Sequence, residues 1–396
     1  MRGPLEGVKV LDLTRVLAGP FCCMLLGDMG AEVVKVERAE RGDDVRSLEP
    51  QVGGESLYFL VMNRNKLGIT LNFRHPQGPW LLKELVRHAD VLVENFRAGT
   101  MEKMGCGYDT LKAINPRLIM ASISGFGQDG PHSQDTCYDV IAQAMSGIMD
   151  MTGDPDGPPM MAGTYVIDYS TALYAVIGIL GALRAREQTG VGQRVDVALL
   201  DTAVSFLITA IPEYLLLGRK MTRLGNRDRF CAPASLFRSK DGEWVYVAAA
   251  NDSLFPQLLK VMGQEEVLQD PRFATNEARM AHVEEAEDVL ARWVGSRTAE
   301  EVVGLVRGAG LPCAKIASIA DVVVNPQVRH RGMLVEVEHP TAGRVPMHGL
   351  NIHFSQTRKE IRRPAPLLGQ HNQEVYGRWL GLPPERVAQL KSEGLI

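Results

Sequence analysis

The sequence predicts an α/β protein in which a large domain with a parallel sheet is joined to a smaller α+β domain. One observation is that residues 1–130 alternate short apolar runs, typical of buried strands, with stretches of helical periodicity. This alternation favours a doubly wound parallel sheet, because strands joined through a helix pair in parallel. The other is that residues 234–320 change character, with a hairpin pattern followed by charged amphipathic helices. That change indicates a second domain.

The order strand, helix, strand begins at the N-terminus. GVKVLDL (7–13) predicts a buried strand, the following LAGPFCCMLLGDMGA predicts a helix that ends near Gly30, and AEVVKVER (31–38) predicts a second strand. Such a βαβ unit places its ligand beyond the carboxyl ends of the strands. Further strands are predicted within 63–73, where a basic turn comes first, and at 90–96 and 118–127, with a helix at 76–89.

The remaining elements set the domain boundaries. We predict a Rossmann-like large domain over 1–205, a linker over 206–233, a small α+β domain over 234–322 and a return to the large domain over 323–396. An apolar helix is expected over 201–218, running into the basic, turn-rich stretch 221–233. A hairpin with its turn at 341–343 and a terminal helix are expected to close the chain.

Composition indicates a soluble globular protein. The 396 residues carry a net charge of -4, with 45% hydrophobic and 23% charged residues, which argues against nucleic acid or a membrane as the main partner. The N-terminus shows neither a signal core nor a transit pattern, and the longest apolar run, around 173–183, is too short to span a bilayer. Six cysteines form no C-x-x-C pair, so we expect free thiols and a cytoplasmic protein.

The stretch 163–196 places one carboxylate, Asp168, at the start of a long apolar helix. Aspartate is a preferred N-cap because its oxygens accept the unpaired N–H groups of the first helical turn. Asp168 is therefore either a helix cap or a reactive group, and composition alone favours the cap. The helix is expected to end before Gly190 and Gly192, with Arg184 and Arg186 in its last turn.

Other motifs exclude several kinds of site. The nine histidines form no zinc-binding pattern, and neither G-x-S-x-G nor the P-loop motif occurs, so no metal site is predicted. GFGQDG (125–130) follows a strand but precedes no helix, which makes a dinucleotide site a weak interpretation beside a plain turn or a ligand-facing glycine loop. Cys22 and Cys23 are interpreted as buried apolar residues. Arg15, Lys35 and Arg38 lie near strand ends, where each alone is best interpreted as a surface charge and the group together suggests a phosphate-bearing ligand.

Several motifs in this order resemble the class III CoA transferases, the CaiB/BaiF or formyl-CoA transferase family, over essentially the whole chain. They are LEGVKVLDLTRVLAGP, GAEVVKVER, the NRNK turn, DVLVENFRAG, SISGFGQDGP, YDVIAQAMSG, TGVGQRVDVALLD and PAPLLGQHNQEV. The VNPQV and RGMLVEVEHPTAG segments are most similar to the branch that contains succinyl-CoA:glutarate CoA-transferase. The resemblance implies an interlaced homodimer that moves CoA between an acyl-CoA and a small carboxylic acid.

The resemblance makes Asp168 the nucleophile. Its carboxylate is expected to attack the acyl-CoA thioester, giving a mixed anhydride and then an aspartyl-CoA thioester. No permanently bound cofactor is implied, since the CoA thioester is a substrate. Contacts to CoA are implied for Val16, Leu17, Arg38, Leu71, Asn72, Phe73, Arg74, Asn95, Phe96, Arg97 and Lys103, and contacts near the thioester for Tyr138 and Asp139. Among the CoA contacts, Lys103 stands where formyl-CoA transferases have an arginine.

Departures from the family pattern narrow the substrate. Formyl-CoA transferases usually have a glutamine at the position of Leu17 and a glycine run that residues 225–325 lack. Formyl-CoA and oxalate are therefore disfavoured, and dicarboxylates such as succinate and glutarate are expected. A distal carboxylate needs a cation, and Arg15, Arg46, Arg64 and Arg227 are the candidates.

Two alternatives stay open. One is an α-methylacyl-CoA racemase or epimerase, although Tyr138 stands at the position of that enzyme's histidine and tyrosine is a poor proton shuttle near neutral pH. The other is a non-catalytic CoA-binding protein in which Asp168 is structural.

Overall fold

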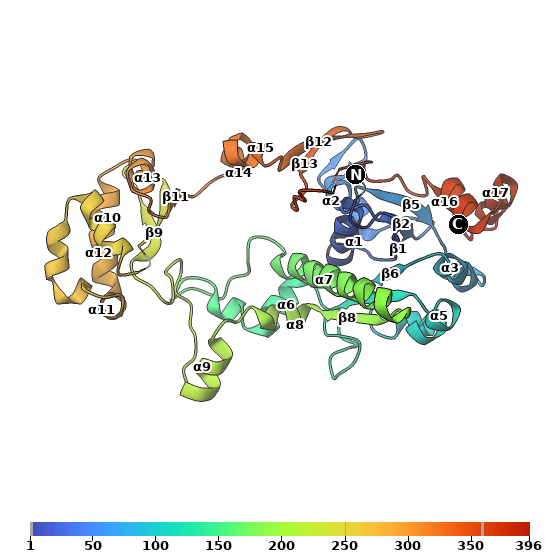
Figure 1. Cartoon of the computed structure of the whole chain (residues 1–396), viewed down its shortest axis with the longest axis horizontal. Coiled ribbons are helices and arrows are strands. Elements are labelled where there is room, and N and C mark those ends of the chain that lie inside the picture. Colours follow the sequence, from blue (N-terminus) through green and yellow to red (C-terminus); the bar gives the residue numbers. More distant parts are fainter. Residues whose placement is uncertain (1–2, 250, 358–359) are drawn as a thin grey trace. The chain divides into compact units, whose positions relative to one another are not determined.

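The computed structural model describes residues 3–249, 251–357 and 360–396 (Figure 1). The chain folds into two compact units. The first consists of Met1–Ile148, Met161–Ile211 and Pro326–Ile396, and the second of Met149–Met160 and Pro212–Asn325. The expected small domain, 234–322, lies inside the second unit, which also takes in 149–160 and most of the expected linker.

A six-stranded sheet organises the first unit, and all of its neighbouring strands run parallel, as the sequence predicted. The strand order is β5-β2-β1-β6-β7-β8. From β1 the chain adds β2 and β5 on one side and then returns to place β6 on the other, so the topology reverses between β1 and β6. The strands are β1 (Lys9–Asp12), β2 (Glu32–Glu37), β5 (Lys66–Thr70), β6 (Val91–Glu94), β7 (Ile119–Ser124) and β8 (Arg194–Ala198).

Alternate residues of these strands bury opposite faces of the sheet. Val10, Val33 and Val93 pack against α1 (Ala18–Asp28) and α7 (Val166–Thr189). Leu11, Val34 and Leu92 face the other way, against helices that include α3 and the C-terminal α16 and α17. Both faces are apolar because helices cover both, as expected of a parallel sheet. The other helices of this unit are α2 (Leu57–Met62), α3 (Gly78–Val86), α4 (Thr100–Lys103), α5 (Tyr108–Ile114), α6 (Asp139–Ser146), α8 (Leu199–Ser205), α15 (Pro326–His330), α16 (Asn372–Leu380) and α17 (Pro384–Ser392).

The NRNK turn is a buried structural element. The Arg64 guanidinium is fully buried, bonds both Asp28 oxygens and donates to the carbonyls of His348 and Gly349. The Lys66 ammonium donates to Asp12 Oδ2 at 2.8 Å, the Pro20 carbonyl at 2.8 Å and Asn63 Oδ1 at 2.9 Å. The basic side chains of this turn are thus bonded inside the protein.

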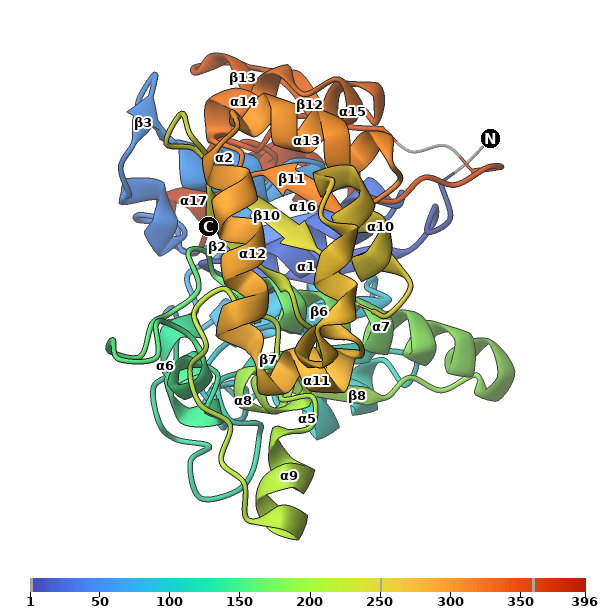
Figure 2. The ribbon, with the colours of Figure 1, turned by 90° about the vertical axis from the view of Figure 1, so that its left-hand side faces the viewer.

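The second unit contains an antiparallel sheet in the order β11-β10-β9, and Figure 2 shows α10 and α12 in front of it. Charged amphipathic helices follow the β9–β10 hairpin, as the sequence predicted. Its elements are β9 (Ala234–Arg238), β10 (Trp244–Ala248), β11 (Cys313–Lys315), α10 (Leu254–Met262), α11 (Asn276–Ala281), α12 (Val283–Gly295), α13 (Ala299–Gly308) and α14 (Ile319–Val324). In the first unit, β3 (Gln51–Val52) pairs with β4 (Glu55–Ser56), and β12 (Leu334–His339) with β13 (Gly343–His348).

Three local expectations differ from the structure. The expected helix over 201–218 is two helices, α8 and α9 (Ala210–Leu217), bent by 69° where Ile208 has a φ of 47°. Strand β8 was not expected from the sequence. Asp168 is not the N-cap of α7: the helix begins at Val166, its N-cap is Tyr165, and Asp168 is its third residue.

Helix α7 is long and apolar enough to cross a membrane by length and composition. Its position gives another reason for that composition, because Ala172, Ala175 and Ile179 are fully buried in the core shared with α1 and the sheet. A core helix of an α/β unit needs the same apolar residues.

Candidate active site at the carboxyl edge of the sheet

A cavity of about 230 Å³ lies within the first unit, among the loops that follow β1, β6 and β7 and the starts of α1, α7 and α8. This is the carboxyl edge of the sheet at its topological reversal, where open α/β sheets bind their ligands. Seven of the residues expected at the site line it, namely Val16, Leu17, Asn95, Phe96, Arg97, Tyr138 and Asp168.

Asn95 joins the two loops across the reversal. Its Oδ1 accepts the Arg15 N–H at 3.0 Å and its Nδ2 donates to the Arg15 carbonyl at 2.7 Å. The expected role of Asn95 was a contact to CoA, whereas here its amide is bonded to the neighbouring loop. It therefore fixes the shape of the cavity floor.

Val16 has a φ of 70°, a conformation that β-branched residues rarely adopt. The strain is held by Asp43, whose Oδ1 accepts the Val16 N–H at 3.1 Å and whose Oδ2 accepts from the buried Lys35 at 2.9 Å. Lys35 is thus a support of the loop and not a surface cation. The next residue, Leu17, is the N-cap of α1 and supplies no side-chain hydrogen bond, so the first turn of α1 borders the cavity uncapped.

Asp168 extends into this cavity from the first turn of α7. Its own N–H and that of Ile167 donate to Asp139 Oδ2, at 3.0 and 2.7 Å. Its carboxylate accepts no hydrogen bond from the described residues. Burial, and next the negative charge of Asp139, raise the pKa of Asp168 to about 7. The group is therefore a half-buried carboxylate that ionises near neutral pH. Its oxygens remain available to a substrate because no described residue donates a hydrogen bond to them.

Asp139 stands behind Asp168 and does not line the cavity. The expectation was a place near the thioester. Its carboxylate is instead bonded to main-chain N–H groups of α7 and to the amide of Gln143. No sequence signal could assign this role, because the partners are 28 and 29 residues away along the chain.

Two arginines are among the residues that line the cavity. Arg15 donates to Asp44 at 3.2 Å and lies over the Phe96 ring, and Asp44 also pairs with Arg38. Arg97 donates to Thr136 Oγ1 at 2.6 Å and is exposed. Asp44 links Arg38 to the cavity edge, although Arg38 is not part of the lining.

The remaining expected residues lie outside the cavity. Leu71 is fully buried, and Asn72 bonds the C-terminal segment through its N–H to Leu395 and its amide to Gly394. Phe73 packs partly buried on the core, while Arg74 and Lys103 are exposed. Residues 71–74 follow β5, two strands from β1 on the same edge of the sheet.

The structure separates the four arginine candidates for a distal carboxylate. Arg46 makes a double hydrogen bond with Glu37, Arg64 is buried on Asp28, and Arg227 makes a double bond with Glu287. Each of these three guanidinium groups is already bonded to a carboxylate, and none of the three lines the cavity. Arg15 is the member of the set that lines the cavity with Asp168.

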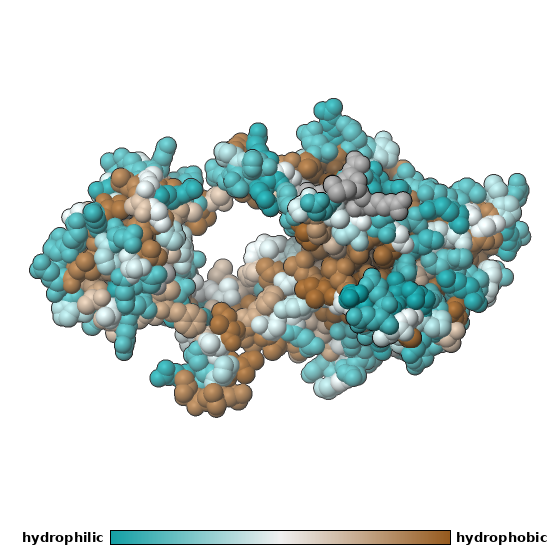
Figure 3. Space-filling model, in the orientation of Figure 1, coloured by the Kyte–Doolittle hydropathy of each residue, from teal (hydrophilic) through white to brown (hydrophobic). Residues whose placement is uncertain are grey.

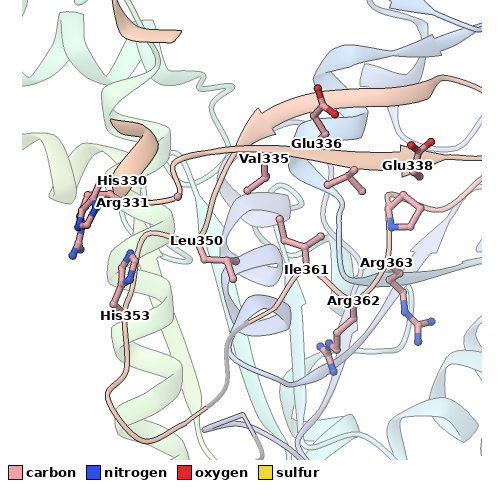
Figure 4. Close-up of a pocket in the computed structure, with 13 residues that line it drawn as sticks. His330, Arg331, Val335, Glu336, Glu338, Leu350, His353, Ile361, Arg362 and Arg363 are labelled. Atoms are coloured by element: carbon pink, nitrogen blue, oxygen red, sulfur yellow. The ribbon is translucent and has the colours of Figure 1, made fainter. Parts of the chain in front are cut away.

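A larger cavity of about 680 Å³ lies between β12 and the segment after β13 (Figure 4). Val335, Leu350 and Ile361 form its apolar part, and the Glu336 and Glu338 side chains extend to the opposite side of the strand from Val335. None of the expected site residues lines it. Among the described residues, no group of three His, Cys, Asp or Glu side chains could hold a metal ion.

Comparison with known proteins identifies the family of this chain. The profile of CoA-transferase family III matches residues 5–372. The chain belongs to CoA-transferase family III. This confirms the family resemblance predicted from the sequence motifs, and the protein is an enzyme of the CoA-transferase type.

Relatives in this family match along almost the full chain. The mouse succinyl-CoA:glutarate CoA-transferase is 39% identical over 398 residues, covering 99% of this chain and 90% of the relative. The acetyl-CoA:oxalate CoA-transferase of Acetobacter aceti is 40% identical over 371 residues, covering 93% and 94%. The crystal structure of a CaiB/BaiF family protein from Brucella suis superposes with a TM-score of 0.85 at 37% identity, covering 96% of this chain and all of that one.

Proposed function

We propose that this family III CoA-transferase moves CoA between small dicarboxylic acids through covalent intermediates on Asp168. The carrying observation is the unbonded Asp168 carboxylate at a helix start, inside the cavity where the sheet topology reverses. No resident cofactor is needed, because the acyl-CoA thioester is itself a substrate. The cysteines are free thiols, in keeping with a cytoplasmic location.

The chemistry begins when an Asp168 oxygen attacks the thioester carbonyl carbon. The C–S bond breaks, which leaves a mixed anhydride and CoA thiolate. The thiolate attacks the aspartyl carbonyl and expels the donor acid as its carboxylate, so an aspartyl-CoA thioester remains. The acceptor carboxylate attacks this thioester and releases the thiolate again. The thiolate then attacks the acceptor's acyl carbon, which yields the new acyl-CoA and restores Asp168.

The carboxyl edge of the sheet provides a path for CoA. Arg38 directly follows β2 and Arg74 lies four residues beyond β5, and these two strands are about 5 and 10 Å from β1 by strand spacing. Guanidinium groups suit the diphosphate and the 3′-phosphate of CoA. The pantetheine arm would then run toward Phe96 and Tyr138, with the thioester against Asp168. The uncapped start of α1 offers N–H groups to negative charge that develops there.

Trapping on Asp168 tests this proposal. The protein is mixed with succinyl-CoA, quenched with borohydride or hydroxylamine, and analysed as intact protein and then as peptides. We expect the modification on the peptide that holds Asp168. CoA binding without an adduct would favour the non-catalytic alternative. Exchange of the α-proton of a 2-methylacyl-CoA with deuterium, with no acyl exchange, would instead establish the racemase.

Arg15 is proposed to bind the distal carboxylate of the acceptor. Its guanidinium lines the cavity and bonds one oxygen of Asp44, leaving the other nitrogens without a partner among the described residues. Replacing Arg15 by Ala is expected to lower kcat/KM for glutarate about 10- to 100-fold, the usual worth of a charged hydrogen bond. For pentanoate, which has no second carboxylate, the loss should stay within about threefold.

The matched control for Arg15 is Arg184→Ala on the exposed side of α7, where Arg184 pairs with Glu187. Steady-state rates with both acids decide the outcome. An equal loss for glutarate and pentanoate would show that Arg15 acts on CoA and not on the acceptor.

We also propose a homodimer, interlaced as the family resemblance implies. Helix α9 has no buried residue, and its Leu215 and Leu216 are 73% and 80% exposed, which appears as a brown patch in Figure 3. Apolar exposure on this scale marks a protein interface.

Light scattering should give twice the 43.5 kDa of one chain. Leu216→Glu should weaken the dimer at least about tenfold, whereas Leu305→Glu, at an exposed leucine of α13, should not. An unchanged mass for both would place the interface elsewhere.

A further inference from the structure

Asp139, which belongs to α6, caps the start of another helix, α7, with its side chain. The N-cap residue of α7, Tyr165, makes no side-chain hydrogen bond to the helix. The two N–H groups of Ile167 and Asp168 are instead satisfied by Asp139 Oδ2, which comes from the first residue of α6 and is buried. An uncapped helix start would leave these donors without partners.

The same contact is reinforced by Gln143, one turn along α6. Its Nε2 donates to Asp139 Oδ1, and its Oε1 accepts the Ala162 N–H at 3.0 Å. The segment that enters α7 is therefore held at two points by α6. Any movement of the Asp139 carboxylate would displace the main chain of Asp168 itself.

Asp139 is also the charged group that, after burial, raises the pKa of Asp168. The charge of Asp168 also acts on Tyr58 from α2, on Cys137 from the segment before α6 and on Tyr169 of α7. Burial raises the pKa of the Cys137 thiol to about 11 and raises the pKa values of Tyr58 and Tyr169, so these groups are neutral near pH 7. Across the cavity the charges balance, with Arg15 and Arg97 against Asp44 and Asp135.

We propose that Asp139 is a positioning residue, whose carboxylate holds the Asp168 nucleophile in place and sets the charge behind it. The inference rests on the proposed function of Asp168. It assigns Asp139 no contact with the thioester, because its oxygens already bond α7 and Gln143. Charge and geometry have separate consequences, so separate variants can test them.

Asp139→Asn keeps an oxygen for the α7 N–H groups and removes the charge, although its amide nitrogen cannot accept the hydrogen bond that Gln143 Nε2 donates to Oδ1. The readout is kcat/KM for succinyl-CoA and glutarate between pH 5 and pH 9. Wild-type activity should rise with pH through a midpoint near the Asp168 pKa of about 7. In Asp139→Asn this midpoint should fall by about one pH unit, while kcat at pH 8 stays within about tenfold. The control is Asp109→Asn, an exposed first-turn carboxylate of α5 that should leave the midpoint unchanged.

Gln143→Leu tests the positioning role while the negative charge of Asp139 is retained. It also provides a test of the proposal if Asp139→Asn does not fold. We expect kcat to fall about 10- to 100-fold, the usual cost of misplacing a catalytic group, with the midpoint unchanged. A midpoint that stays at the wild-type value in Asp139→Asn, or a wild-type kcat in Gln143→Leu, would overturn the proposal. Asp168→Asn is measured in parallel: if it retains turnover, the proposed nucleophile is wrong, whatever the Asp139 and Gln143 variants show.

Discussion

Asp168→Asn should abolish CoA transfer, with a loss of about 10⁴-fold or more in kcat. The amide has nearly the same shape but cannot attack a thioester as a carboxylate does, so neither the anhydride nor the aspartyl thioester can form. The CoA affinity should stay within about threefold, because the basic residues at the sheet edge are untouched. Isothermal titration with CoA and a coupled assay of acyl exchange measure the two properties.

The same substitution should stabilise the fold above neutral pH. Because the folded pKa of Asp168 is raised to about 7, the folded chain binds this proton more tightly than the unfolded chain, and stability is lost as the pH rises from about 4 to 7. A neutral Asn avoids that loss. At pH 8 we expect the free energy of unfolding to rise by about 1 to 2 kcal/mol, and at pH 4 to change little.

Asp201→Asn is the matched control, since Asp201 is an exposed carboxylate in the first turn of α8. It should keep both activity and stability. If Asp168→Asn instead lowers stability at pH 8 and retains activity, Asp168 is a structural residue. This result would restore the interpretation that composition alone favoured.

Gain in stability and loss of activity in one variant is the pattern expected of a reactive group held in an unfavourable environment. A capping aspartate would behave in the opposite way, because its carboxylate would be bonded and its removal would cost about 1 kcal/mol. The structure makes the difference visible: the donors at the start of α7 are bonded to Asp139, and the Asp168 carboxylate is left for chemistry.

The sequence predicted those parts of the fold that depend on local pattern. The strands β1, β2, β6 and β7 are apolar runs buried on both faces, and such runs can be recognised without knowing their neighbours. Strand β8 was not predicted because it lies at the sheet edge. Its sequence, RVDVA, has charged residues at Arg194 and Asp196. Edge strands carry such residues, which weakens their signal.

The site was predictable where a motif marks a loop and unpredictable where the role depends on a distant partner. Asn95 and Phe96 end a strand pattern and do line the cavity. In the sequence, Arg64 and Lys66 are basic residues next to a predicted strand, as Arg15 is. The first two are buried because Asp28 and Asp12, 36 and 54 residues earlier in the chain, lie beside them. Net charge in a motif does not reveal whether it faces a ligand or a buried counter-charge.

Lys66→Met should produce the largest loss of stability, about 3 to 5 kcal/mol, because it leaves Asp12 as a buried charge without its main partner. Both side chains are fully buried. Burial alone would raise the pKa of Asp12, but Lys66 and Lys35 together hold it below its usual value. Urea denaturation at pH 7.5 measures the effect, with the exposed Lys391→Met as control, expected within about 0.5 kcal/mol of wild type.

The double variant Asp12→Asn with Lys66→Met should recover part of that stability, because no charge is then left unpaired. We expect its cost to be at least about 1 kcal/mol smaller than the sum of the two single variants. A strictly additive result would mean that the two groups contribute independently, contrary to the 2.8 Å contact between Lys66 Nζ and Asp12 Oδ2.

This pair also connects stability to the site. Lys66 bonds the carbonyl of Pro20 in the first turn of α1, and Asp12 accepts the N–H of Thr14, so together they fix both ends of the loop that carries Arg15 and Val16. A partly recovered double variant should therefore still bind CoA more weakly than wild type, since Asn and Met cannot both hold that loop. Equal CoA affinity in the double variant and wild type would show that the loop is held by Asp43 and Asn95 alone.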